Sequence, residues 1–362
     1  MEEFKVLAIN PGSTSTKIAV YRNNKSVFLK NIKHTAEEIA QFKTITDQFG
    51  FRKEIILREL KEAGIDVNKI SAIVGRGGLL KPIESGVYEV NEQMKNDLRN
   101  SIMGEHASNL GALIADDIAQ SLPSAKAYIA DPVVVDEMDE VARIAGHPKF
   151  KRVSIFHALN QKAIARLHAK SLDRRYEEMN IIVAHLGGGI SVGAHRQGRV
   201  VDVNNALDGD GPFSPERAGT IPAGQLAKLC FSGEVTYDEV KKMLTGKGGL
   251  VAHAGTNDAY EIELKARSGD AKAKLLQDAM SYNIGKAIAA MAGTLKGKVD
   301  VIILTGGIAH NAYLVEYVKE MVGFIAPVAV YPGEDEMQAL AMNGLMVLKG
   351  EVMPREDRKS VV

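Results

Sequence analysis

Short apolar runs alternate along the chain with longer stretches of helical period, a pattern typical of an α/β fold. Three apolar runs come first, at residues 6–9, 17–21 and 26–30, and two turns separate them. The first turn, residues 10–16, reads Asn-Pro-Gly-Ser-Thr-Ser-Thr. Strands joined by turns this short predict an antiparallel meander rather than a strand–helix–strand opening.

The same arrangement returns in mid-chain, at 181–186, 190–195 and 199–203, with Gly187–Gly189 as the first turn. A second repeated feature is a pair of apolar runs that lead into glycines, at 70–74 and 301–305. The repeated order predicts an internal duplication and two domains, with a boundary between 131 and 140. We expect domain I to comprise residues 1–135 and 338–362, and domain II residues 136–337.

Helical periods fill the intervals between these runs. We expect a helix over 154–172 with Ser154 as its N-cap, a buried helix over 270–295, and a last helix over 334–349. The first should bury the stripe Phe156, Leu159, Ala163 and Leu167. The second should bury Leu276, Met280, Ile284, Ile288, Met291 and Leu295.

Composition adds bounds to this pattern. The chain has 362 residues, which at about 150 per domain suggests two domains. Apolar and charged fractions of 45% and 25% exclude disordered and collagen-like classes. Lys plus Arg and Asp plus Glu both number 45, and this balance argues against nucleic acid or an anionic membrane as the main partner. The single cysteine, Cys230, cannot form an internal disulfide, and no apolar run approaches the ~18 residues of a membrane helix, so we expect a cytoplasmic protein.

Two common phosphate-binding motifs are missing from the chain. Gly285-Lys286-Ala287 lacks the Ser/Thr and upstream glycine of a P-loop, and no GxGxxG follows a strand. The Gly-, Ser- and Thr-rich turns at 12–16 and 187–191 remain, and exposed amides and hydroxyls in such turns can hold phosphate oxygens. Either turn alone could be a plain hairpin. As a matched pair in a duplicated fold, they predict a phosphate site in a cleft.

Several charged residues stand where a strand meets a turn. Arg76, within Gly75–Gly78, is placed to grip a carboxylate or phosphate, although a solvated loop arginine fits equally well. Asp131 ends a strand-like run before a proline and could hold a hydrated magnesium ion. His185 precedes the glycine turn, whereas His157 on its own is more simply a core residue. The nine histidines show no zinc-binding spacing.

Three segments together resemble the acetokinase family, within the acetate and sugar kinase/Hsp70/actin superfamily: 10–17 (NPGSTSTK), 184–191 (AHLGGGIS) and 305–311 (TGGIAHN). The likeness runs in order from Lys5 to about Lys349. It implies two ribonuclease H-like (actin-like ATPase) domains, each a mixed five-stranded sheet with helices, and an active-site cleft between them. It also implies reversible phosphoryl transfer between an acyl phosphate and ADP with Mg²⁺, and a homodimer or higher homo-oligomer.

The resemblance assigns roles to matching positions. For catalysis it points to Arg76, Asp131, His157, His185 and, as a substitute for a second family arginine, Arg217. For magnesium it points to Asn10, Asp131 and Glu336. For the nucleotide it points to Gly12, Ser13, Thr14, Ser15, Thr16, Gly187, Gly188, Gly189, Asp258, Gly306, Gly307, Ile308 and Asn311. Two positions depart from the family pattern: Ile221 stands where its second arginine would follow Gly219-Thr220, and Tyr260 stands at its adenine-side arginine.

The acyl pocket is also expected to depart from that of acetate kinases. Gly77 and Gly78 follow the arginine where those enzymes have valines, and Ala107-Ser108-Asn109 replaces Leu-His-Asn. We expect Gly77, Gly78, Ala107, Asn109, Phe156 and Pro215 to line a pocket widened for butyrate or branched homologues. Each additional buried methylene would contribute ~0.8 kcal/mol, nearly fourfold in affinity.

Other functions remain open on sequence alone. Within enzymes, the alternatives are an acetate, propionate or isobutyrate kinase. A different class is a non-catalytic, nucleotide-switched actin-like protein or a chaperone-type ATPase, which needs no carboxylate clamp. A sugar kinase would be expected to carry a catalytic base and polar sugar-binding loops, and neither is found in the sequence.

Overall fold

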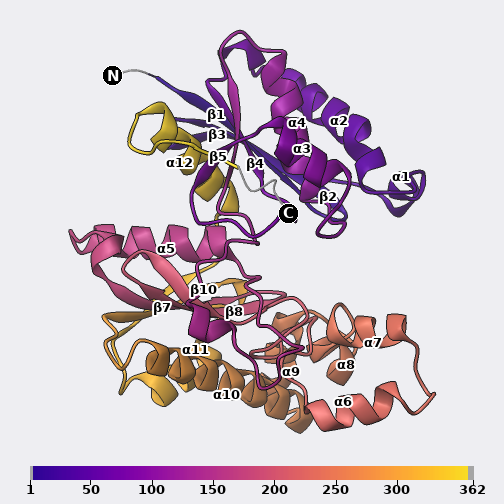
Figure 1. The fold of residues 1–362 in the computed structure, drawn as a ribbon, viewed down its shortest axis with the longest axis vertical. Coiled ribbons are helices and arrows are strands. Elements are labelled where there is room, and N and C mark those ends of the chain that lie inside the picture. The colour runs from indigo at the N-terminus through magenta and orange to yellow at the C-terminus, as the bar shows by residue number, and fades with distance from the viewer. Residues whose placement is uncertain (1–2, 358–362) are drawn as a thin grey trace. The chain divides into compact units, whose positions relative to one another are not determined.

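The computed structural model describes residues 3–357 and separates into two compact units (Figure 1). The first unit contains the chain up to Val135 and again from Asp335, and the second contains Asp136–Glu334. Glu336 therefore belongs to the same unit as Asn10 and Arg76. Residues 1, 2 and 358–362 of the expected domain I lie outside the described residues.

The first unit is built on a seven-stranded sheet of order β12-β5-β6-β4-β1-β2-β3. As predicted, β1, β2 and β3 form an antiparallel meander, while β4 runs parallel to both β1 and β6. The expected five strands are too few, because the short strands β5 and β12 extend the sheet beyond β6. The strands are β1 (Lys5–Pro11), β2 (Ser15–Arg22), β3 (Lys25–Lys33), β4 (Ala72–Arg76), β5 (Val87–Glu89), β6 (Lys126–Ala130) and β12 (Arg355–Glu356).

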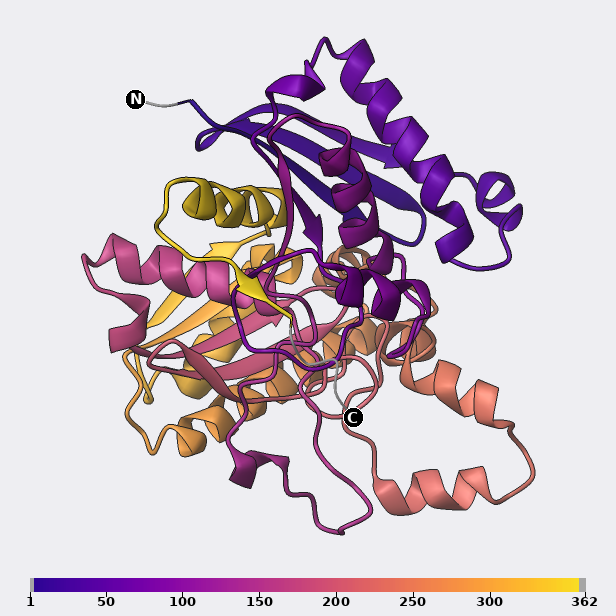
Figure 2. The same ribbon diagram turned by 45° about the horizontal axis from the view of Figure 1, so that its top comes forward.

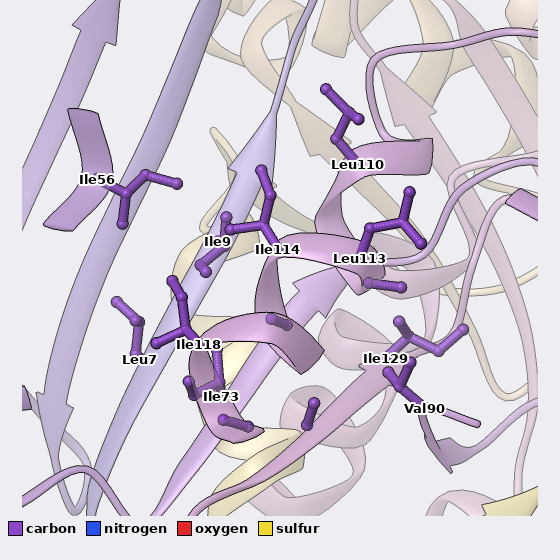
Figure 3. Packing of buried hydrophobic residues seen from close by; sticks show 14 of the residues in the cluster. Leu7, Ile9, Ile56, Ile73, Val90, Leu110, Leu113, Ile114, Ile118 and Ile129 are labelled. Atoms are coloured by element: carbon purple, nitrogen blue, oxygen red, sulfur yellow. The ribbon is translucent and has the colours of Figure 1, made fainter. Parts of the chain in front are cut away.

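Helices cover both faces of the first sheet, because successive strand residues point to opposite sides. Leu7 and Ile73 share one apolar cluster with Ile114 of helix α4 (Figure 3). Val6 and Val74 face the other way, against Gly344 of the last helix, α12. The helices of this unit are α1 (Ala36–Ala40), α2 (Phe49–Glu62), α3 (Glu92–Arg99), α4 (Asn109–Gln120) and α12 (Glu336–Leu348), with single 3₁₀ turns η1 (Thr46–Gln48) and η2 (Val67–Lys69).

The second unit repeats the core of the first. Its five-stranded sheet has the order β11-β10-β7-β8-β9, which corresponds position by position to β6-β4-β1-β2-β3. Parallel and antiparallel pairings also correspond, so the duplication is confirmed. The strands are β7 (Asn180–Leu186), β8 (Ile190–Arg196), β9 (Arg199–Val203), β10 (Val301–Gly306) and β11 (Val328–Pro332).

Helices α10 and α11 pack on the face of the second sheet that carries Ile182 and Leu304, and α5 packs on the face that carries Ile181 and Ile303. The expected buried helix is confirmed as α10. Helices α6 and α7, the salmon helices of Figure 2, bury none of their residues. The helices are α5 (Ala158–Ser171), α6 (Ala223–Cys230), α7 (Tyr237–Leu244), α8 (Gly249–Ala254), α9 (Ala259–Arg267), α10 (Ala271–Thr294) and α11 (Ala312–Val322), with 3₁₀ turns η3 (Glu140–Arg143), η4 (Tyr176–Glu178) and η5 (Gly307–His310).

Helix α5 differs from its prediction at its start and along its buried face. It begins at Ala158 with His157 as the N-cap, and not with Ser154. The preceding residues are held outside the helix, since the carbonyl of Ile155 accepts a hydrogen bond from the Ala206 amide at 2.9 Å. Leu167, expected in the core, is 55% exposed, and polar residues such as Gln161 are buried instead.

No helix within residues 3–357 is both long enough and apolar enough to cross a membrane.

Candidate active site

Three of the predicted site residues lie at one edge of the first sheet. Strand β4 pairs in parallel with β1 on one side and with β6 on the other. Ile9 is opposite Gly75, and Arg76 is opposite Ala130, so Asn10, Arg76 and Asp131 all stand where these strands end. Polar side chains at the carboxyl ends of parallel strands are typical of ligand sites in α/β folds.

Arg76 forms a compact polar group with Asn10 and Glu336. Its Nη1 donates to Glu336 Oε2 at 3.0 Å and, more weakly, to Asn10 Oδ1 at 3.4 Å. Asn10 Nδ2 donates to the same Glu336 oxygen at 2.6 Å. The Arg76 side chain is 26% exposed and that of Glu336 is 14% exposed. The structure therefore brings together three predicted residues, and the arginine is held in place while still open to solvent.

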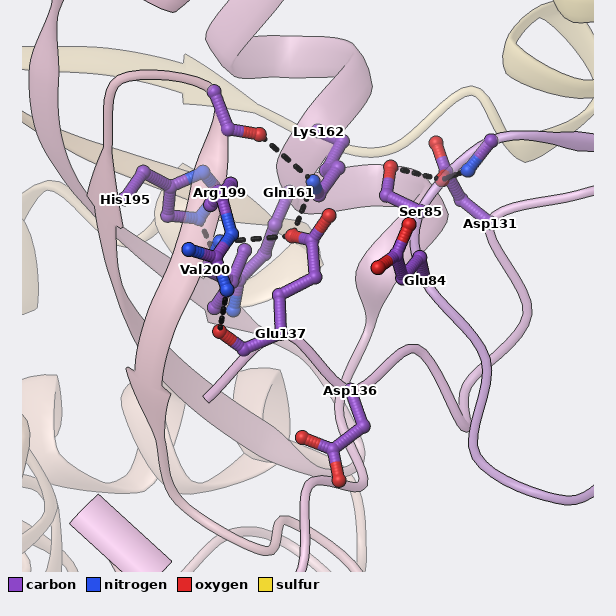
Figure 4. Close-up of polar contacts among 12 residues, drawn as sticks. Glu84, Ser85, Asp131, Asp136, Glu137, Gln161, Lys162, His195, Arg199 and Val200 are labelled. Carbon is purple, nitrogen blue, oxygen red and sulfur yellow. Dashed lines mark hydrogen bonds and ion pairs between the residues drawn. The ribbon is translucent and has the colours of Figure 1, made fainter. Parts of the chain in front are cut away.

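Asp131 is tied to a turn beside this group. Its Oδ1 accepts hydrogen bonds from Ser85 Oγ at 2.6 Å and from the Gly86 amide at 2.8 Å (Figure 4). Its backbone φ is +38°, which is unusual for a residue with a side chain. Strain of this kind is typical of functional positions, where surrounding contacts enforce it. The 85–86 turn thus fixes the direction of a carboxyl group that is 1% exposed.

The hydroxyl-rich turn at 12–16 is held from within by Arg52 of helix α2. Arg52 is fully buried, and its guanidinium donates to the carbonyls of Gly12 at 2.9 Å, Ser15 at 3.0 Å and Ser13 at 3.3 Å. In a trans peptide the N–H points away from the C=O, so the amides that follow Gly12 and Ser13 point away from Arg52. The exposed part of the turn can therefore present N–H groups to an anion.

Thr16 is the exception among the predicted residues of this turn. Its hydroxyl accepts from Arg52 Nη1 at 2.9 Å and contacts His34 Nε2 at 2.8 Å, and the residue is fully buried. A hydroxyl engaged in this way supports the turn from below. Direct contact between Thr16 and a nucleotide is therefore not supported by the structure.

Two predicted histidines meet in the second unit. The rings of His157 and His185 lie 4.2 Å apart between centroids, at 30° to each other. His185 Nε2 contacts Glu334 Oε2 at 3.1 Å, and a carboxylate oxygen can only accept, so this nitrogen carries a proton. His185 is 1% exposed, and its Nδ1 has no hydrogen-bond partner among the described residues.

The triple-glycine turn and Arg217 are also adjacent. The Gly188 carbonyl accepts from Ser214 Oγ at 2.7 Å, which holds the two loops together. A Cβ at Gly189 would lie 2.0 Å from Arg217 Nη1, so the guanidinium occupies the place of the missing side chain. Arg217 also donates to the Ala206 carbonyl at 2.5 Å, and burial lowers its pKa. The Arg217 side chain therefore packs directly against the glycine turn.

The remaining predicted nucleotide residues comprise a glycine turn, two helix N-caps and one residue of the apolar core. Gly306 has φ +91° and exchanges backbone hydrogen bonds with Gly333 at 3.0 and 2.9 Å, while Gly307 is exposed and has open space around it. Asn311 is the buried N-cap of α11, and Asp258 is the exposed N-cap of α9. Capping accounts for both polar side chains without a ligand. Ile308 is buried within the apolar core of the unit.

The part of the expected acyl-pocket widening that was assigned to Gly77 and Gly78 is wrong. A Cβ at Gly77 would lie 2.5 Å from Pro132 Cβ, and one at Gly78 would lie 2.5 Å from Asn109 Oδ1. These glycines allow close packing and do not open space. The Asn109 side chain is used for structure, since it accepts from the Leu79 amide at 2.9 Å and donates to the Gly104 carbonyl at 3.0 Å. The other predicted lining residues are buried: Ala107, Phe156 and Pro215.

Comparison with known proteins identifies the family of this chain. The profile of the acetokinase family matches residues 150–329. The chain is 55% identical over 349 residues to butyrate kinase 2 of Clostridium acetobutylicum, covering 96% of this chain and 98% of that protein. It is 54% identical over 353 residues to butyrate kinase 1 of the same organism, covering 98% and 99%. The chain belongs to the acetokinase family.

Solved structures support the family fold at lower identity. The acetate kinase of Porphyromonas gingivalis superposes with a TM-score of 0.76 at 20% identity, covering 95% of this chain and all of that one. A propionate kinase of Francisella tularensis gives a TM-score of 0.72, also at 20% identity. At such identity the likeness shows the fold alone. The acetokinase fold predicted from three short motifs is confirmed.

Several polar residues of this acetokinase-family chain were not found from the sequence. Gln161 lies one helical turn after His157, a spacing that places both on one face and could have indicated it. Glu334 stood out only as the first residue of the last predicted helix. Arg52 gave no local signal, because its partners in the 12–16 turn are about forty residues away.

Proposed function

We propose that this protein transfers a phosphoryl group reversibly between ATP and a short-chain carboxylate, with butyrate as the preferred acceptor. The observation that carries the proposal is identity of about 55% over nearly the full length of both chains to proteins named butyrate kinase. In the forward direction a carboxylate oxygen forms a bond to the γ-phosphorus, the bond to the ADP oxygen breaks, and acyl phosphate and ADP leave. The reverse direction yields butyrate and ATP.

Arg76 is proposed as the group that binds the carboxylate and the transferred phosphoryl. Its guanidinium has more donors than its two partners use, and a planar fork suits both anions. Glu336 and Asn10 orient it, so little side-chain entropy has to be lost when the substrate binds. Asp131 is proposed to act near the transferred phosphoryl, with its direction set by Ser85 and Gly86.

On the nucleotide, the exposed amides and hydroxyls of Ser13 and Thr14 are proposed to hold phosphate oxygens. In the second unit, the Gly187–Gly189 turn with Arg217, and the Gly306–Gly307 turn, are proposed to contact nucleotide. His157 is proposed as a hydrogen-bond donor to the moving phosphoryl, and His185, whose Nε2 faces Glu334, is proposed to flank it. Preorganised donors of this kind are the main means by which proteins accelerate phosphoryl transfer.

A magnesium ion fits the donor set of the first unit. Within residues 3–357 no three His, Cys, Asp or Glu side chains gather as a metal cluster. Mg²⁺ in phosphoryl-transfer sites is commonly held by one or two protein oxygens, the remainder coming from water and phosphate. The carboxylates of Glu336 and Asp131 and the amide oxygen of Asn10 are proposed to provide those protein oxygens. When bound, the ion supplies charge neutralisation on the phosphates.

No general base is needed for this reaction. A carboxylic acid with a pKa near ~4–5 in solution is already an anion at pH 7 and can attack without losing a proton. The protein therefore has to hold two anions in line and neutralise the equatorial oxygens of the moving group. Arg76, Arg217 and the amides and hydroxyls of the turns are cations and hydrogen-bond donors, which suits that task. Direct in-line transfer follows as the proposed route.

The test is hydroxamate trapping of the acyl phosphate with acetate, propionate, butyrate and isobutyrate as acceptors. We expect the highest kcat/KM with butyrate or isobutyrate, and a loss of about 100-fold or more in the Arg76→Ala variant, because a charge-assisted transition-state contact is removed. Arg174→Ala is the matched control, since Arg174 forms an exposed pair with Asp300 at 2.9 Å and should keep wild-type rates.

Two outcomes would contradict the proposal. ATP hydrolysis that is indifferent to every carboxylate would favour a nucleotide-switched actin-like protein. Equal or better kcat/KM with acetate or propionate than with butyrate would move the assignment to another carboxylate kinase of the family.

A further inference from the structure

A continuous chain of polar side chains runs through the interior of the second unit and ends at His157. Tyr176 Oη contacts His195 Nδ1 at 2.7 Å, and His195 Nε2 contacts Gln161 Oε1 at 2.9 Å. Gln161 Nε2 contacts Ser191 Oγ at 2.8 Å, and Ser191 Oγ contacts His157 Nδ1 at 2.8 Å. Figure 4 shows the link between Gln161 and His195. Gln161, Ser191 and His195 are each 0% exposed.

The orientation of the Gln161 carboxamide in this chain is set by one backbone group. The carbonyl of Ser191 lies 3.0 Å from the Gln161 carboxamide, and a carbonyl oxygen can only accept. The atom facing it must therefore be Nε2, and Oε1 must face His195. Gly193 makes room for this orientation, because a Cβ there would lie 2.5 Å from Gln161 Oε1.

The directions of the hydrogen bonds at the Tyr176 end of the chain follow from this orientation. Gln161 Oε1 can only accept, so His195 Nε2 carries a proton. Burial, together with the nearby charges of Lys162 and Arg166, lowers the pKa of His195 well below 6.5, so its ring is neutral at pH 7. Its Nδ1 consequently has a lone pair, and the Tyr176 hydroxyl donates to it.

At the other end, Gln161 determines which way the Ser191 hydroxyl points. Ser191 Oγ accepts one proton from Gln161 Nε2 and faces the His157 backbone amide at 3.4 Å. The proton of the hydroxyl then has one acceptor among the described residues, which is His157 Nδ1. Reversing this bond would leave a buried hydroxyl proton without a partner, which costs about 1–3 kcal/mol.

We infer that the chain from Tyr176 through His195, Gln161 and Ser191 fixes the tautomer of the neutral form of His157, with the proton on Nε2, which makes Gln161 and Ser191 positioning residues. In this tautomer His157 Nε2 is a donor and has no lone pair. A donor stabilises phosphoryl oxygens, whereas a bare nitrogen would repel them. The role in catalysis rests on the proposed function, whereas the tautomer itself does not.

The test combines ¹⁵N NMR of histidine-labelled protein with kinetics. In the wild type, we expect His157 Nε2 to give the resonance of a protonated ring nitrogen and Nδ1 that of an unprotonated one. Gln161→Glu keeps the shape but replaces both donors with an acceptor, so the Ser191 hydroxyl should turn toward it and then accept from His157 Nδ1. We expect the tautomer to invert, and kcat for acyl phosphate formation to fall about 100-fold with less than threefold change in KM for butyrate.

Gln225→Glu is the matched control, because Gln225 lies on the exposed helix α6 of the same unit and should change neither readout. If Gln161→Glu does not fold, Ser191→Ala replaces it, and the expected result is a mixture of tautomers with reduced kcat. A protonated Nδ1 in the wild type would overturn the inference. So would a folded Gln161→Glu or Ser191→Ala protein with the wild-type tautomer and kcat. Loss of the proposed function would appear separately, as wild-type protein without acyl phosphate formation but with an intact tautomer signal.

Discussion

Arg52 is a buried cation of the first unit, and its hydrogen-bond partners are uncharged oxygens. Six hydrogen bonds hold its guanidinium, to three carbonyls of the 12–16 turn, to Thr16 Oγ1, and twice to Gln48 Oε1. Burial lowers its pKa to about 10, which still leaves it charged at neutral pH. A charged group bound only by dipoles adds a positive potential beneath a turn that is proposed to hold phosphate.

Replacing Arg52 with methionine should therefore affect both stability and nucleotide binding. We expect the free energy of unfolding of the first unit to fall by about 3 kcal/mol, because buried carbonyls and Gln48 lose their donors, and KM for ATP to rise. Urea titration followed by far-UV circular dichroism measures the first effect, and initial rates measure the second.

Arg58→Met provides the control on the same helix. Arg58 is exposed and paired only loosely with Glu62, at 3.9 Å, so its replacement should change stability by less than about 0.5 kcal/mol. Equal unfolding midpoints for the two variants would show that Arg52 does not support the turn.

At the scale of elements, strand β4 and helix α4 touch through glycines. A Cβ at Gly75 would lie 2.2 Å from the Gly111 carbonyl oxygen, and a Cβ at Gly111 would lie 2.3 Å from that of Arg76. This contact brings the backbone of α4 directly against the strand end that carries Arg76. The position of the proposed substrate arginine thus depends on two residues that have no side chain.

Gly111→Ala should separate the helix from the strand. We expect a loss of about 1–3 kcal/mol in stability from overpacking, together with a raised KM for the carboxylate as Arg76 shifts. Gly50→Ala is the control, since Gly50 lies in helix α2 of the same unit with nothing within 4 Å of an added Cβ, and should be neutral or slightly stabilising. Thermal unfolding and the carboxylate KM are the measurements. A Gly111→Ala protein as stable as Gly50→Ala, with an unchanged KM, would show that this close approach does not position Arg76.

At the scale of the molecule, duplication explains how the two units provide different chemistry from one plan. Asn10 and His185 are both the sixth residue of the first strand of their meander, and both stand just before a turn. The first unit thus has a carboxamide beside Arg76 where the second has an imidazole beside Glu334. One unit presents a cation with its oriented partners, and the other presents a pair of adjacent histidines.

The last helix makes the first unit depend on both ends of the chain. Met337, Leu340 and Leu345 of α12 are buried, and Gly344 packs against Val6 and Val74. A chain ending at Glu334 should therefore leave one face of the first sheet uncovered, with fast amide hydrogen exchange in strands β1 and β4, while the second unit keeps its protection. A chain ending at 349 keeps α12 and is the control. Protection of β1 and β4 in the shorter chain would contradict this dependence.

The extent of prediction from the sequence differs from element to element. The meanders, the buried helix α10 and the duplication were predicted because apolar periodicity is strong in those segments. The start of α5 was not, because a long-range hydrogen bond to Ala206 holds Ile155 outside the helix, and no local pattern records that partner. Gly77 and Gly78 were interpreted as open space, although Pro132 and Asn109 fill it.

The sequence by itself therefore determined the fold class, the repeated strand order and the kinase family, because these are written in local periodicity and in contiguous motifs. Tertiary structure alone decided which side chains meet. Glu336 reaches Asn10 across more than three hundred residues, Arg52 supports a turn about forty residues away, and Ser191 links Gln161 to His157. Hydrogen bonds depend on distance and direction in space, and no spacing along the chain specifies either.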